Sequence, residues 1–171
     1  NDAYGKSKLM AEEFINSIDS EDFKVSIIRP PLIYGPGVKG NMKKLMGLVK
    51  KRTLLPLGNI NNQRSMIGLD NLIAFLDKVI EKESSGKFLV QDERPVSTSE
   101  LITTIAKVHN PNLRLIPIPK VFQSLMKFGL PEIHKRLFGS LIVDDRVSKK
   151  KLNFVPPLSF EKGIEVMVKN S

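Results

Sequence analysis

Short strand-like segments alternate with amphipathic helical segments along the 171 residues of this chain, and this alternation constrains its fold more than any other feature. Runs of β-branched and aliphatic residues predict strands at 24–29, 65–67, 87–90 and 113–118. Apolar residues at helical spacing predict helices at 2–18, 42–51, 70–80, 97–108, 120–128, 131–138, 145–152 and 159–169. Strands that alternate with helices are typical of an α/β protein.

The predicted sheet is incomplete in the first half of the chain. Only residues 25–28 form a convincing hydrophobic strand there, whereas a parallel α/β sheet needs several buried central strands. The chain also starts inside a predicted helix, at Asn1, without an initiator Met. We therefore expect it to be the C-terminal part of a larger protein.

Composition argues against several classes of site and partner. The chain has no Cys, which excludes disulfides, thiolate metal ligands and Cys nucleophiles and suits a reducing compartment, so we expect a cytoplasmic protein. No apolar run approaches the roughly 18 to 20 residues that a membrane-spanning helix needs. His109 and His134 lack partners for a metal site or a catalytic triad. We expect neither a metal nor a membrane partner.

The net charge is strongly positive, at 27 − 18 = +9. Its short basic clusters, at 43–44, 50–52 and 149–151, have no interleaved aromatic residues, and no nucleic-acid-binding motif is present. Solvated helix faces explain most of these charges, and attraction of a phosphate-bearing substrate is the main alternative. Nucleic acid is not an expected partner.

Several helix residues have specific expected positions. Asn1 or Asp2 is expected to cap the first helix, Asn41 the helix at 42–51, and Asp70 the helix at 70–80. The inward face of that last helix is expected to consist of Leu72, Ile73, Leu76 and Ile80. Packing in the core or in a lid is expected for Phe122, Met126 and Phe128.

Tyr4 and Lys8 are four residues apart in a predicted helix, so their side chains share one face, with Cβ atoms about 5 to 6 Å apart. A tyrosine phenol ordinarily has a pKa of about 10 and is a poor proton shuttle near pH 7. A neighbouring ammonium stabilises the phenolate and makes proton transfer easier. On spacing alone, an exposed helix pair without a catalytic role remains the competing interpretation.

Four segments together resemble the extended short-chain dehydrogenase/reductase family of nucleotide-sugar epimerases, dehydratases and reductases. They are YGKSK at 4–8 followed by Ala11 and Glu12, IRPPLIYGPG at 28–37, QRSMIGLDNL at 63–72, and LNFVPP with FEKGI at 152–157 and 160–164. They resemble the active-site helix, the strand and loop after it, the substrate-domain signature and the C-terminal segment of the family. The resemblance covers essentially the whole chain.

The resemblance implies the C-terminal part of a Rossmann-like, doubly wound NAD(P)-binding fold together with the small α/β substrate-binding domain. Residues 1–38 would be the last part of the dinucleotide-binding domain. Residues 39–171 would form mainly the nucleotide-sugar-binding domain, with returns of the chain to the first domain. The family's Gly-rich phosphate loop and catalytic Ser or Thr would lie upstream of Asn1, so the 171-residue piece alone is expected to be inactive.

The resemblance also implies roles for the motif residues around the coenzyme. Tyr4 would be the catalytic acid/base, and Lys8 would be its electrostatic partner and a ligand of the nicotinamide ribose hydroxyls. The nicotinamide pocket would be lined by Pro30, Pro31 and Leu32. The coenzyme would be NAD or NADP.

For the substrate, the resemblance assigns the diphosphate to Asn41 and Arg64, with Arg136 as a weaker second candidate. A helix N-terminus binds anions through free N–H groups, and a guanidinium forms bidentate bonds with them. Leu55 and Leu57 would flank the nucleotide base. A plain helix cap for Asn41, and surface charges for the two arginines, are the competing interpretations.

The implied activity is hydride transfer at C4 of a UDP-linked hexose or N-acetylhexosamine by a 4-epimerase or a 4-reductase. Residues 30–32 and 136–141 resemble members that serve cell-surface polysaccharide synthesis. The active-site helix would allow a homodimer. The alternative from a different class is a non-enzymatic basic binding domain with a residual family signature.

Overall fold

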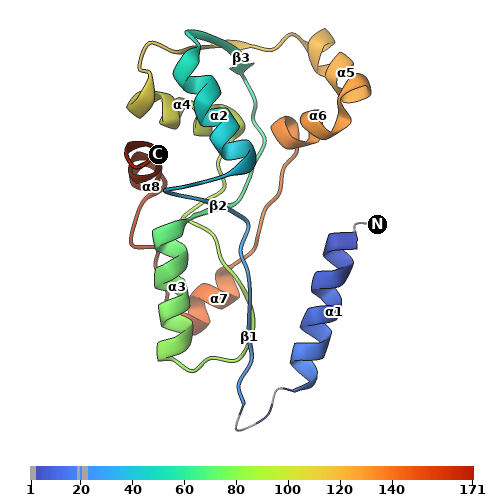
Figure 1. The fold of residues 1–171 in the computed structure, drawn as a ribbon, viewed down its shortest axis with the longest axis vertical. Helices are drawn as coiled ribbons and strands as arrows, with labels where there is room; N and C mark the ends of the chain where they lie inside the picture. The colour runs from blue at the N-terminus through green and yellow to red at the C-terminus, as the bar shows by residue number, and fades with distance from the viewer. Residues whose placement is uncertain (1–2, 19, 21–22) are drawn as a thin grey trace.

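A computed structural model describes residues 3–18, 20 and 23–171 as an α/β structure (Figure 1). In chain order, its elements are α1 (Ala3–Ser17), β1 (Ser26–Arg29), β2 (Leu32–Tyr34), α2 (Gly40–Lys51), β3 (Leu54–Gly58), β4 (Met66–Gly68), α3 (Leu69–Glu81), β5 (Gly86–Leu89), α4 (Thr98–His109), β6 (Arg114–Pro117), α5 (Lys120–Gly129), α6 (Pro131–Phe138), α7 (Arg146–Leu152) and α8 (Phe160–Lys169). Each predicted helix is present to within two residues at its described ends. The prediction missed β2 and β3, which are short and contain or follow proline.

Within the described residues, the strands pair two by two, and every pair is parallel. β1 pairs with β5 in the register Ser26 to Gly86, and β2 pairs with β4 in the register Leu32 to Met66. β3 pairs with β6, with an irregularity after Leu55. Parallel pairing between strands separated by helices confirms the predicted α/β class.

Two clusters of buried apolar side chains hold these elements together. The larger cluster joins α2, α4 and α8 to β2 and β3, and the C-terminal end of α6 packs on its margin. The smaller cluster joins α3 and α7 to β4 and β5, with Ile28 of β1 packed against it. Phe75 lies at its centre and makes edge-to-face contacts with Phe88 and Phe154 at centroid distances of 6.2 and 5.1 Å.

A buried polar cluster connects the two apolar ones. The Asp92 carboxylate accepts hydrogen bonds from the Tyr34 hydroxyl at 2.6 Å, the Asn71 amide at 2.7 Å and the Gly68 N–H at 3.1 Å. Burial, and secondarily the negative charge of Asp92, raise the pKa of Tyr34 far above its ordinary value. Tyr34 therefore stays protonated and donates to Asp92, which ties β2 to α3.

α1 stands apart from the rest of the chain in Figure 1, and none of its described residues is buried. An ion pair between Glu12 and Arg29 links α1 to β1. The apolar residues Leu9, Met10 and Phe14 are exposed on it. α1 therefore offers a large uncovered surface.

The structure corrects two expected helix caps. α2 begins at Gly40 with Lys39 as its N-cap residue, so Asn41 lies in the first turn instead of capping the helix. α3 begins at Leu69, and Asp70 is likewise in the first turn. In both helices the chain adopts helical geometry one or two residues earlier than the side-chain preference predicted. The expected caps Asn1 and Asp2 lie outside the described residues.

The buried face of α3 also differs from the prediction. Leu72 is buried as expected, but its buried apolar partners are Phe75 and Val79. Ile73, Leu76 and Ile80 are exposed. Apolar residues thus lie on two faces of α3, and the packing of this helix on β4 and β5 buries the face that carries Leu72, Phe75 and Val79.

None of the helices formed by the described residues combines the length and the hydrophobicity that a membrane-spanning segment requires.

Candidate functional site

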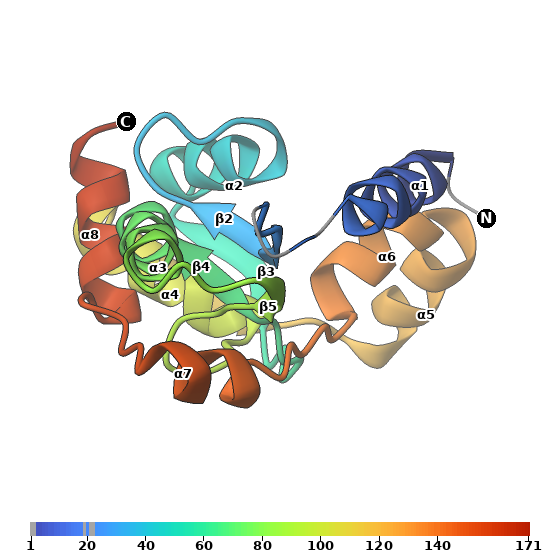
Figure 2. The same cartoon turned by 90° about the horizontal axis from the view of Figure 1, so that it is seen from below.

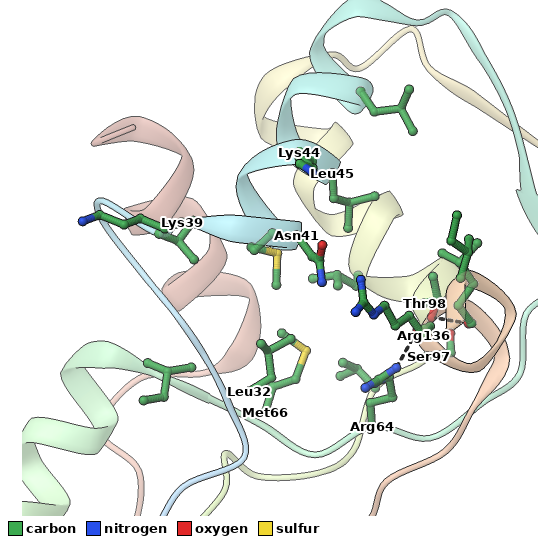
Figure 3. Close-up of a pocket in the computed structure, with 18 residues that line it drawn as sticks. Leu32, Lys39, Asn41, Lys44, Leu45, Arg64, Met66, Ser97, Thr98 and Arg136 are labelled. Carbon is green, nitrogen blue, oxygen red and sulfur yellow. Dashed lines mark hydrogen bonds between the residues drawn. The ribbon is translucent and has the colours of Figure 1, made fainter. Parts of the chain in front are cut away.

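A cavity of about 580 Å³ opens between α2, β2, the starts of β4 and α4, and α6. Figure 3 shows the side chains that line it, which come from segments far apart in the sequence. The lining includes Leu32, Asn41, Arg64 and Arg136, four of the residues that the sequence analysis singled out. These residues span 105 positions of the chain, so only the fold brings them together.

Asn41 reaches the cavity because of the way α2 begins. Gly40 has a φ of 65°, in the left-handed region that glycine adopts at no cost, and it turns the chain into the helix. The N-cap residue Lys39 makes no side-chain capping bond to the first turn. The first N–H groups of α2 are thus free of a side-chain cap and lie beside the Asn41 amide, an arrangement that suits an anion.

Arg64 is held in place by three other segments. Its backbone exchanges hydrogen bonds with Val96, at 2.9 and 3.0 Å, and also bridges to Leu141. Its guanidinium donates to the main-chain carbonyl of Arg136 at 2.5 Å. The backbone of Arg64 is therefore fixed by neighbouring segments, and one edge of its guanidinium already donates a hydrogen bond to the Arg136 carbonyl.

Arg136 lies on α6, whose C-terminal end is fixed to α4. The Thr98 hydroxyl donates to the Leu137 carbonyl at 2.8 Å, and the Asn62 amide donates to the Gly139 carbonyl at 3.0 Å. Asn62 in turn accepts from the Thr98 N–H at 2.8 Å. Asn62 and Thr98 thus position Arg136 although neither was predicted from the sequence, where each resembles an ordinary polar turn residue.

The charged side chains that line the cavity all carry positive charge. Its cationic lining residues are Lys39, Lys44, Arg64 and Arg136, and no carboxylate belongs to the described lining. Figure 3 shows the Asn41 amide and the two guanidinium groups on one side of the cavity, with Lys39 extending away from them. Lys44 was missed because its sequence context is that of a solvated helix face, and Lys39 because it belongs to no motif in the loop before α2. The arrangement can bind a multiply charged anion by charge-assisted hydrogen bonds.

Apolar side chains form the rest of the wall. They come from α2, α4 and α6 and include Leu45, Leu48, Leu101, Ile133 and Leu137. A cavity with apolar walls and a few convergent polar groups has the usual build of a small-molecule site.

Leu55 and Leu57 do not line this cavity. Alternation along β3 turns both side chains inward, and each is buried in the larger core cluster. Their placement gives no support to a role in flanking a nucleotide base.

Tyr4 and Lys8 lie on α1, and no residue of the described part of α1 contributes to the cavity lining. The Lys8 ammonium lies 5.6 Å from the centroid of the Tyr4 ring, so the two side chains share a helix face as predicted. The Tyr4 side chain is 69% exposed. Pro30 and Pro31 also lie outside the lining, whereas their neighbour Leu32 belongs to it.

Acidic and histidine side chains do not gather into a metal site anywhere in the described ranges, since no group of three or more such residues could hold an ion.

Comparisons with known proteins agree on one family. The model of the NAD dependent epimerase/dehydratase family matches residues 1–90. A UDP-glucose 4-epimerase from Vibrio cholerae is 37% identical over 96% of this chain and 52% of its own length. An N-acetyl-alpha-D-glucosaminyl-diphospho-ditrans,octacis-undecaprenol 4-epimerase from Escherichia coli O157:H7 is 21% identical over 95% of this chain and 54% of its own length.

Solved structures show the same fold. The UDP-N-acetylglucosamine 4-epimerase from Bacillus cereus superposes with a TM-score of 0.70 at 18% identity, covering 95% of this chain and 52% of that structure. The chain thus spans about half the length of the relatives that it matches.

Proposed function

The chain belongs to the NAD dependent epimerase/dehydratase family, and on this basis we propose that it provides the substrate-binding and proton-transfer groups of a nucleotide-sugar 4-epimerase or 4-reductase. The proposed substrate is a UDP-linked hexose or N-acetylhexosamine. The observation that carries the proposal is the cavity in which Asn41, Arg64 and Arg136 converge with no opposing carboxylate among the described lining residues.

The substrate's diphosphate would bind at the cationic side of this cavity. The first N–H groups of α2 and the Asn41 amide would donate to one phosphate, and the free edges of Arg64 and Arg136 would donate to the other. Hydrogen bonds to charged groups contribute about 1.5 to 3 kcal/mol each. The apolar lining residues, instead of the buried Leu55 and Leu57 side chains, would contact the base and the sugar.

The exposed face of α1 would meet the coenzyme. The Lys8 ammonium and the Tyr4 phenol lie close together on this face. The ammonium is a donor that suits ribose hydroxyls, and the phenol is a donor that suits a reacting oxygen. A bound nicotinamide coenzyme, NAD or NADP, supplies the acceptor and donor of hydride. Lys8 would bind the ribose hydroxyls and stabilise the Tyr4 phenolate. Tyr4 would exchange a proton with the C4 oxygen of the sugar.

Pro30, Pro31 and Leu32 would border the nicotinamide ring, and Leu32 would connect this border to the substrate cavity. We propose that residues 1–38 end the dinucleotide-binding domain and that residues 39–171 form mainly the substrate domain. The packing of Ile28 with α3, β5 and α7 supports a return of the chain to the first domain. The exposed apolar side chains of α1 support burial against the coenzyme-binding half or a second copy.

Binding of UDP to the chain tests the diphosphate site directly. We expect Arg64→Ala and Arg136→Ala to weaken UDP binding about 10- to 100-fold each in isothermal titration, because each loses a charge-assisted bond. Arg114→Ala is the matched control, since Arg114 is an exposed arginine of β6 outside the cavity. Equal UDP affinity in all three variants would favour the alternative, a basic binding domain without this substrate site.

Turnover distinguishes the two reactions. An enzyme of the relatives' length that carries this chain should convert a UDP-sugar without added coenzyme if it is an epimerase. A reductase should consume NADPH stoichiometrically with a 4-keto sugar.

A further inference from the structure

The position of α6 depends on contacts at its C-terminal end. α5 and α6 form a hairpin on the side of the molecule opposite α8, joined to the rest through its ends (Figures 1 and 2). None of the described side chains of this hairpin is buried. Phe122 and Phe128 are 63% and 86% exposed, which overturns the expectation that they pack in the core or in a lid against the described chain. Leu137 and Phe138, at the end of α6, pack on the larger apolar cluster.

Side chains from two other segments satisfy main-chain carbonyls at this end of α6. A helix leaves its last four carbonyls without partners inside the helix. Here three donors replace the missing bonds. The donors and the residues whose carbonyls accept are Arg64 and Arg136, Thr98 and Leu137, and Asn62 and Gly139. We refer to the side chains of Asn62, Arg64 and Thr98 as the α6 clamp.

Asn62 is the residue of this clamp that joins two helices. It is 7% exposed. Its amide oxygen accepts from the N–H of Thr98, the first residue of α4, at 2.8 Å, and its amide nitrogen donates to the Gly139 carbonyl at 3.0 Å. Because a buried amide without a partner is unfavourable, these two bonds favour one relative position of the start of α4 and the end of α6.

The α6 clamp also links the two arginines of the cavity. The Arg64 guanidinium donates to the main chain of Arg136, so a shift of α6 would move one arginine and remove a hydrogen bond from the other. Both arginines line the cavity, whereas Asn62 does not belong to the lining. Asn62 would therefore act on a ligand through the residues that it holds and not by contact.

A diphosphate and a single phosphate would use this arrangement differently. In the proposed function, one phosphate lies at the start of α2 beside Asn41, and the other lies at Arg64 and Arg136. A diphosphate gains from both groups only when they are held at a distance that matches its two linked phosphates. A single phosphate occupies one group and does not need this match.

We propose that Asn62 is a positioning residue that gives the cavity a preference for a diphosphate over a single phosphate. It does so by holding Arg64 and Arg136 at a fixed distance from the start of α2. This role rests on the proposed function, because it requires the anion to bind between these groups. Any substrate joined through a diphosphate would depend on Asn62 in the same way.

Asn62→Asp separates the two bonds of the amide, since a carboxylate can accept from the Thr98 N–H but cannot donate to the Gly139 carbonyl. We expect the Kd for inorganic pyrophosphate to rise about tenfold in isothermal titration, and the Kd for inorganic phosphate to change by less than about twofold. Asn61→Asp is the matched control and should leave both Kd values unchanged. It adds the same charge at an exposed neighbour outside the cavity lining.

Asn62→Ala removes both bonds without adding charge and should have the same effect on the two anions. Partial unfolding would raise the apparent Kd of both anions by the same factor, so the ratio of the two Kd values reports the positioning role alone. Circular dichroism measures the folded fraction of each variant. An unchanged ratio in both Asn62 variants would overturn the proposal.

A second substitution tests whether Asn62 acts through Arg136. In an Arg136→Ala background, Asn62→Ala should lose most of its effect on the Kd for pyrophosphate, because the group that it positions is absent. An effect of full size in that background would overturn the proposal. Unchanged pyrophosphate affinity in Arg136→Ala alone would contradict the diphosphate site of the proposed function and, with it, this role of Asn62.

Discussion

Tyr4 and Lys8 show how little a short motif says at the scale of single residues. Their side chains meet on one exposed helix face, with the ammonium 5.6 Å from the ring centroid, as any pair at this spacing can. Their proposed role depends on the family to which the chain belongs and on the cavity that other segments build.

The roles proposed for this pair predict different kinetic defects. In an enzyme of the relatives' length, Tyr4→Phe should lower turnover about 10²- to 10⁴-fold with little change in coenzyme affinity, because only the proton-transfer group is lost. Lys8→Ala should lower both turnover and coenzyme affinity, since Lys8 would also bind the ribose. Steady-state kinetics and coenzyme titration measure the two effects. Turnover near that of the parent enzyme in Tyr4→Phe would refute its assigned role.

Tyr34 and Asp92 are a second residue pair, with a structural role. Tyr34→Phe removes the donor at 2.6 Å from the buried Asp92 carboxylate, so it should lower the free energy of unfolding by about 1 to 3 kcal/mol near neutral pH. Urea unfolding measures the change. A loss within a few tenths of a kcal/mol would show that Asp92 is satisfied without this bond.

The pH dependence of this pair follows from the raised pKa of Tyr34. Above pH 10 the unfolded chain releases the Tyr34 proton and the folded chain keeps it, so the unfolded state binds fewer protons and stability falls as pH rises. The parent chain should therefore lose its advantage over Tyr34→Phe at alkaline pH. The range from about pH 8 to about pH 11 brackets the pKa of an ordinary tyrosine. A difference in the free energy of unfolding between the parent chain and Tyr34→Phe that stays constant over this range would contradict the prediction.

At the scale of elements, the packing of α8 on β2 depends on the absence of a side chain. A Cβ on Gly163 would lie 2.8 Å from the Tyr34 hydroxyl oxygen and 3.0 Å from its ring. Because Asp92 holds this hydroxyl, the ring cannot move away at low cost. Tyr34 thus fixes how closely α8 can approach the strands.

Gly163→Ala should therefore lower the free energy of unfolding by about 1 to 3 kcal/mol, even though alanine favours helix. Gly47→Ala, in the middle of α2 where a Cβ would meet no atom within 4 Å, is the matched control and should raise it by about 0.5 to 1 kcal/mol. Thermal or urea unfolding of the two variants makes the comparison. An increase in the free energy of unfolding of both variants would show that helix propensity outweighs the contact with Tyr34.

At the scale of the whole molecule, the cavity belongs to the part of the structure around the larger apolar cluster. α2, α4 and α6 supply most of its walls, whereas α3 and α7 pack in the smaller cluster. A ligand in the cavity should stabilise the first group of helices directly and reach the second group through the Asp92 cluster.

Hydrogen exchange should show this division. With UDP at about 100 times its Kd, amides in α2 and α6 should exchange up to about 100-fold more slowly, and those of α7 should change little. Mass spectrometry of peptides from the exchanged chain resolves these segments. Uniform slowing over all helices would show that the two clusters unfold as one unit.

The sequence alone determined the α/β class and the positions of the helices, because helix periodicity and strand propensity are local properties. The family resemblance of its short motifs suggested Asn41, Arg64 and Arg136 as candidates. The sequence did not determine which apolar face of α3 is buried, that Leu55 and Leu57 face the core, or that Phe122 and Phe128 are exposed. These outcomes depend on which surfaces meet across tens of residues. Only the tertiary structure brings Arg64, Arg136 and the start of α2 to one cavity, since their hydrogen bonds and packing join segments that no local pattern relates.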